Sequence, residues 1–144
     1  MLKKPLFLEM FVLLATVELL NYIAVVYHLY WTANEFDSLV HFFGGTAVSA
    51  FFLWLYFFSG FFKPSKRKLA EFLLVSLLGT IFIATCWEVY ELFLGEILMN
   101  NHYPSDTAFD FIMALLGATA VCFYGYIREL QNKKTQENTY FNTY

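Results

Sequence analysis

The sequence predicts an all-α integral membrane protein that crosses the bilayer four times as an up-down bundle. Of its 144 residues, 59% are hydrophobic, which is more apolar surface than one soluble core of this size can bury. Four apolar stretches are long enough to cross about 30 Å of hydrocarbon. The connections between them are short, so consecutive helices should run antiparallel.

The expected spans cover residues 6–31, 38–62, 69–98 and 107–127. The first follows two lysines and resembles a signal peptide, but its apolar run is too long and no small-residue cleavage pattern ends it, so we expect a retained helix.

Capping and turn signals set the expected ends of the later spans. The second span should begin with Asn34 as its N-cap and end before Pro64. The fourth should begin near Ser105 or Asp106, just after Pro104, which places the segment 101–105 in an outer turn.

One domain is expected over residues 1–130, followed by a loose polar cytoplasmic tail over residues 131–144, which lack an apolar period. Cys86 and Cys122 lie inside apolar stretches, so we expect free thiols. Small residues recur at helical spacing in the second and fourth spans, as in Gly45-x-x-x-Ser49 and Ala114-x-x-x-Ala118. Such steps let helix backbones approach closely in lipid.

The positive charges predict the orientation. In a four-span topology every Lys and Arg falls on one side, which the positive-inside rule assigns to the cytoplasm together with both termini. These residues are Lys3, Lys4, Lys63, Lys66, Arg67, Lys68, Arg128, Lys133 and Lys134. Three spans with a re-entrant segment would put the middle cluster opposite one end. The net charge of −3 and the absence of a basic stripe exclude nucleic acid as an expected partner.

Six ionisable side chains inside the apolar stretches are the candidate site. They form pairs at i,i+4 or i,i+3 spacing, so each pair shares one helix face. In the predicted topology all lie at the level of the outer leaflet, where an isolated carboxylate costs roughly 2.5 to 3.5 kcal/mol. The pairs are Asp37 with His41, Glu88 with Glu91, and Asp106 with Asp110.

A bound cation is the simplest compensation for this charge. Carboxylates with one imidazole form a hard donor set that suits Mg²⁺, Mn²⁺, Ca²⁺ or Fe²⁺, and Zn²⁺ through His41. We therefore predict a divalent metal site of these six residues. Alternatively, Asp37 completes a capping box, Asp106 caps a helix, and the deeper groups form a proton-sharing network without metal.

The first span carries a looser polar set. Glu18 and Asn21 share a face near mid-membrane, and Glu18 could reach the site from below or pair with a neighbouring helix. A structural role is favoured.

The ordered motifs D-x-x-x-H at 37–41, E-x-x-E at 88–91 and D-x-x-x-D at 106–110, the last followed by Gly117, also carry a family resemblance. Over the last three spans the chain resembles the uncharacterised bacterial inner-membrane proteins of the YjdF type. More distantly, it is similar to the VanZ-like family, associated with resistance to glycopeptide antibiotics. The resemblance implies a multi-pass protein of the bacterial inner membrane with a shared polar site, and it implies no reaction.

Three functions stay open at this point. As an enzyme, the protein would carry out metal-assisted hydrolysis or transfer on a lipid or cell-envelope substrate, with Glu88 or His41 as general base. As a cation, metal or proton-coupled transporter, it would act as a homo-oligomer joined through its small-residue faces. As a non-catalytic modulatory protein, it would use the cluster as a clasp. The helices become almost wholly apolar below Glu18 and Glu88, which favours a blind site over a conduit.

Overall fold

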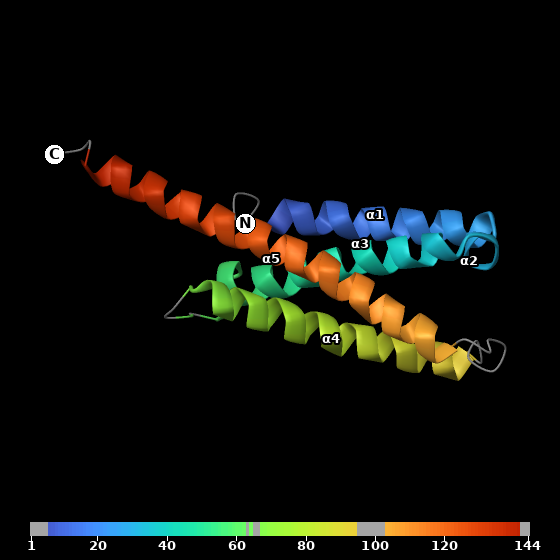
Figure 1. Cartoon of the computed structure of the whole chain (residues 1–144). Helices are drawn as coiled ribbons and strands as arrows, with labels where there is room; N and C mark the ends of the chain where they lie inside the picture. Colours follow the sequence, from blue (N-terminus) through green and yellow to red (C-terminus); the bar gives the residue numbers. More distant parts are fainter. Residues whose placement is uncertain (1–5, 63, 65–66, 95–102, 142–144) are drawn as a thin grey trace.

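The structure is a computed structural model that describes residues 6–62, 64, 67–94 and 103–141, and within these residues every regular element is a helix (Figure 1). In chain order the elements are α1 (Phe7–Val26), α2 (Leu29–Thr32), α3 (Asn34–Leu53), the π-helix η1 (Trp54–Phe58), α4 (Leu69–Leu94) and α5 (Tyr103–Phe141).

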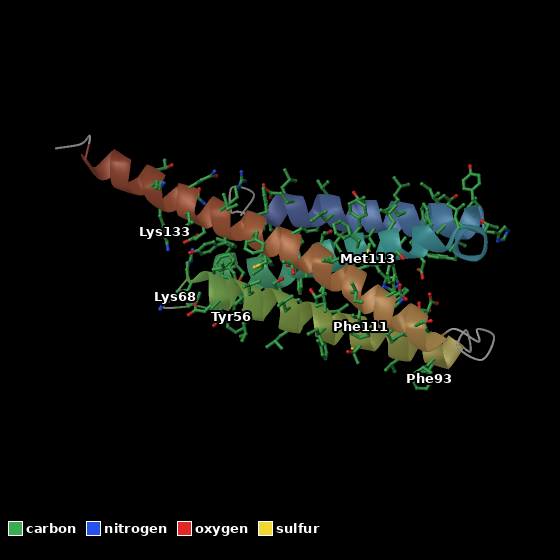
Figure 2. The ribbon with its side chains drawn as sticks, in the orientation of Figure 1. Tyr56, Lys68, Phe93, Phe111, Met113 and Lys133 are labelled. Atoms are coloured by element: carbon green, nitrogen blue, oxygen red, sulfur yellow. The ribbon has the colours of Figure 1, made fainter. Side chains whose placement is uncertain are left out.

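Four helical segments are long and apolar enough to cross a membrane, which confirms the predicted four-span fold. They are Phe7–Val26, Phe36–Phe58, Leu69–Phe93 and Ser105–Thr135. Successive spans run in opposite directions, so the starts of α1 and α4 and the ends of η1 and α5 lie at one end of the bundle (Figure 1). Lys68 and Lys133 lie at this end and Phe93 lies at the other (Figure 2). We call the end with Lys68 and Lys133 the basic end and the opposite end, where α3 and α5 begin, the acidic end. The assignment of the basic end to the cytoplasm stays a prediction.

The first span is shorter than predicted. Helix α1 ends at Val26, and His28 adopts a left-handed conformation with φ of 56° before the four-residue α2 begins. A left-handed residue cannot continue a right-handed helix. The prediction of one helix through residue 31 is therefore wrong. The 20 residues of α1 already span about 30 Å, which frees the following residues to make the connection to α3.

Two predicted helix starts are also corrected. Ala33 is the N-cap of α3 and makes no side-chain capping bond, so Asn34 is the first helical residue rather than the cap. Helix α5 begins at Tyr103, with Pro104 in its first turn, where the missing N–H removes no helical bond. Asp37 therefore does not complete a capping box with Asn34 as the N-cap, and Asp106 lies inside α5 rather than at its N-cap. Residues 101–102 of the predicted outer turn lie outside the described residues.

The polar C-terminal segment differs from the expected loose tail. Helix α5 continues without interruption to Phe141, so residues 131–141 are helical. Five of these eleven positions carry Gln, Lys or Glu, which have good helix propensity.

Aromatic packing holds the basic half of the bundle together. The rings of Phe57 and Phe72 stack with centroids 4.0 Å apart, and Leu53 and Cys122 are fully buried beside them. The π-turn, in which the Ser59 N–H donates to the Trp54 carbonyl at 2.7 Å, belongs to the same region. Cys122 and the exposed Cys86 are both free, as predicted.

Glycines allow α3 and α5 to touch backbone to backbone. A Cβ on Gly45 would overlap the Ala114 carbonyl group, and one on Gly117 would overlap the Phe42 carbonyl oxygen. The small residues thus allow the close helix approach that was predicted, but the contact is between α3 and α5 of the same chain. An oligomer would have to use another surface.

Candidate metal centre

Three of the six predicted ligands meet between α3 and α5. The Nε2 atom of His41 lies 3.5 Å from Oδ1 of Asp37 and 3.8 Å from Oδ1 of Asp110. Each residue offers one ligand atom, and these atoms lie within 4.8 Å of one another. In the part of the chain that the structure describes, no other group of acidic, His or Cys side chains is gathered so closely.

The glycine contact explains why these side chains converge. Residues four apart lie on the same helix face. His41 therefore stands one turn from Gly45, and Asp110 stands one turn from Ala114, on the faces where the two backbones touch. The three side chains therefore lie next to the close crossing of α3 and α5, toward the acidic end.

Burial differs across the three ligands. The Asp110 side chain is 7% exposed, that of His41 14%, and that of Asp37 29%. The cluster is thus deepest at α5 and most accessible at the first turn of α3. A ligand would reach it from the acidic end, along Asp37.

The separations of the three ligand atoms can be compared with those around a bound divalent ion. Two donors bound to one ion at about 2.1 Å lie roughly 3.0 to 3.4 Å apart. The observed separations of 3.5 and 3.8 Å, and the 4.8 Å limit that encloses all three ligand atoms, are longer than this, so the side chains would have to move closer together to bind one ion. Two carboxylates with one imidazole suit Mn²⁺, Fe²⁺ or Zn²⁺, and the carboxylates alone suit Mg²⁺ or Ca²⁺.

Glu88 approaches the site from α4. Its side chain is buried, with 7% of the residue exposed, and its Oε2 accepts a hydrogen bond from the Thr107 hydroxyl at 2.8 Å. Thr107 lies three residues before Asp110, so both point to the same face of α5. Sequence reasoning missed Thr107; its spacing from Asp110 is the signal that could have identified it.

The other two predicted ligands lie outside the tight group. Glu91 accepts a hydrogen bond from Nε1 of Trp87 at 2.6 Å on its own helix, and Asp106 is exposed in the first turn of α5. Both still act on the site electrostatically, because the Asp110 carboxylate is repelled by those of Asp37, Asp106, Glu88 and Glu91. The described structure therefore has three candidate ligands in contact range and three further carboxylates around them.

The polar interior ends below the site. The buried hydroxyls of Ser49 and Ser76 lie 2.7 Å apart, and both reach the Ala118 carbonyl oxygen, at 3.2 and 3.1 Å. Beyond them the apolar cluster around Leu53 and Phe72 separates the site from the basic end. The described residues thus show a site that is closed toward that end.

The looser set on the first span does not join this site. Asn21 accepts a hydrogen bond from the Tyr30 hydroxyl at 2.7 Å, whereas Glu18 is exposed on α1 and lies outside the cluster.

Comparisons with known proteins agree with the membrane fold. A family model described as "Predicted membrane protein (DUF2238)" matches residues 4–131, which include the first three spans and most of the fourth. No curated protein and no solved structure matches the chain.

Proposed function

We propose that this chain, which belongs to the DUF2238 family of predicted membrane proteins, is a membrane-embedded, divalent-metal-dependent hydrolase or transferase that acts on a lipid or cell-envelope substrate. The observation that carries this proposal is the convergence of Asp37, His41 and Asp110 within 4.8 Å at the acidic end of the bundle. Of these three residues only Asp37 had a helix-capping alternative, and the N-cap of α3 is Ala33, not Asn34.

The three convergent side chains would hold the ion. His41 presents Nε2 to both carboxylates, so its role in the proposal is that of a ligand, not of the general base. When bound, a divalent ion supplies Lewis-acid polarisation of a phosphoryl or carbonyl oxygen and activation of water.

Glu88 is the proposed general base. The Thr107 hydroxyl orients its carboxylate by donating to Oε2, and this carboxylate would accept a proton from a nucleophile. The surroundings are suited to this task, since the Glu88 side chain is buried and water competes poorly there for its oxygens.

The substrate class follows from depth. In the proposed orientation the basic end is cytoplasmic, and the ligands lie within about a turn or two of the outer surface, close to lipid headgroups. We also propose that the protein lies in the bacterial inner membrane and is related to the YjdF-type and, more distantly, the VanZ-like proteins. The closed interior below Ser49 and Ser76 supports a reaction at a blind site over passage through the bundle.

Reconstitution tests this function. Wild-type protein in vesicles of a bacterial polar lipid extract should convert one lipid class when Mn²⁺ is present and stop on chelation, with products followed by mass spectrometry. Glu88→Gln should retain the fold and lose turnover, because the amide keeps the volume but cannot act as a base.

The same vesicles, loaded with a metal-sensitive dye, should show no protein-dependent metal flux. Flux that disappears in Glu88→Gln would replace the enzyme proposal with transport. Absence of both turnover and flux, with metal still bound, would indicate a non-catalytic site that only holds α3 and α5 together.

A further inference from the structure

The outward face of α1 carries an acidic residue that the bundle does not explain. Glu18 is exposed, and it lies eleven residues from Phe7 and eight from Val26, so it stands about 12 to 16 Å from either end of the helix. Within the described residues, its carboxylate has no hydrogen-bond or ion-pair partner.

This position is unusual for a membrane helix. Acidic residues inside spans almost always face the bundle interior or a cavity, or pair with another polar group, because hydrocarbon offers none. The other acidic residue of α1, Glu9, follows this rule, since its Oε1 accepts a hydrogen bond from Arg128 at 3.0 Å. Glu18 breaks it.

The surroundings of Glu18 are otherwise apolar. The face that α1 turns away from the bundle follows a helical repeat and consists of Leu8, Phe11, Val12, Ala15, Glu18, Leu19, Tyr22 and Val25. Of the residues in the α1 span only 11% are buried inside the chain, against 39% of those in the span Phe36–Phe58. The helix thus offers a lipid-facing surface with a carboxyl group at its centre.

We propose that this face of α1 is a homodimer interface, in which Glu18 of one copy hydrogen-bonds Glu18 of a second copy. Two copies in one membrane have the same orientation, so a twofold axis along the membrane normal places each residue opposite itself. A protonated carboxyl group carries both a donor and an acceptor, which makes it complementary to its own copy. Ala15, one turn away on the same face, lets the two backbones approach there.

The outward face of α1 is preferred as the dimer surface to the small-residue faces that the sequence suggested, since Gly45 and Gly117 already pack α3 against α5 within one chain. It also requires no other protein. A foreign helix with a basic residue at the same depth is the competing occupant, and it predicts that the purified chain is monomeric.

The test compares two substitutions of Glu18 in the full-length protein. Donor and acceptor labels on separate copies should give energy transfer in lipid vesicles that falls as the lipid-to-protein ratio rises. Glu18→Gln should retain the association, because an amide also donates and accepts. Glu18→Leu should weaken it at least tenfold. Since the side chain is exposed and makes no hydrogen bond or ion pair within the described residues, both variants should keep the wild-type circular dichroism.

Crosslinking provides the geometry. With both native cysteines replaced, Ala15→Cys should form an interchain disulfide, whereas Leu78→Cys, exposed on α4, should not. A monomeric wild-type protein, equal association of Glu18→Leu and wild type, or crosslinking through Leu78→Cys alone would each overturn the proposal.

Discussion

Replacing Gly45 with alanine should separate α3 from α5. The new Cβ would overlap the carbonyl group of Ala114, which is backbone and cannot rotate away. The helices would have to move apart by roughly 1 Å to restore ordinary contact. Overpacking of this kind costs about 1 to 3 kcal/mol, and the upper half of that range applies because no flexible side chain can yield.

Gly44→Ala is the matched control, since nothing lies within 4 Å of a Cβ at that position. Both substitutions gain about 1 kcal/mol of helix propensity, so the difference between them isolates the clash. We expect Gly45→Ala to be less stable than Gly44→Ala by about 2 to 3 kcal/mol. Reversible unfolding in mixed micelles, followed by circular dichroism, measures this. Equal stability of the two variants would refute the close backbone crossing.

Three further predictions concern other parts of the bundle. Arg67→Ala should lower the free energy of unfolding by about 2 kcal/mol, because it removes the guanidinium group that lies 2.9 Å from the buried Glu129 carboxylate. Arg128→Ala breaks a more exposed ion pair and should cost less than about 1 kcal/mol. Equal losses in unfolding experiments would contradict this. Thr107→Val should lower stability by about 1 kcal/mol and reduce turnover, because a buried carboxylate on α4 loses a donor; unchanged values in both assays would remove its positioning role. In a cysteine-free background, an impermeant maleimide should label Thr32→Cys only from outside and Phe61→Cys only from inside, and labelling of both from one side would contradict the topology.

The membrane fold could be predicted from the sequence because span length and apolar composition follow from the thickness of the bilayer. Helix ends could not, because they depend on single backbone conformations. His28 ends the first span by adopting a positive φ, although its side chain carries no strong stop signal. Ala33 replaces Asn34 as the cap of α3 without any side-chain bond, which no capping rule anticipates.

The site was predictable to the level of helix faces. Helical spacing correctly placed Asp37 and His41 on one face, and the structure brings Asp110 to them. The spacing could not show that Glu91 turns to Trp87, or that Thr107 reaches Glu88, because both contacts depend on side-chain rotamers. It also could not show that Glu18 faces outward, since this depends on which side of α1 packs against α3.

Metal binding tests the central claim most directly. Protein purified without chelator should contain about one divalent ion per chain by elemental analysis, and titration of stripped protein with Mn²⁺ or Zn²⁺ should raise its unfolding temperature. Asp110→Asn should weaken binding at least about tenfold, whereas Glu91→Gln, outside the three-ligand group, should change it far less. A folded, metal-free protein whose stability ignores Mn²⁺, Mg²⁺, Ca²⁺, Fe²⁺ and Zn²⁺ would contradict the account.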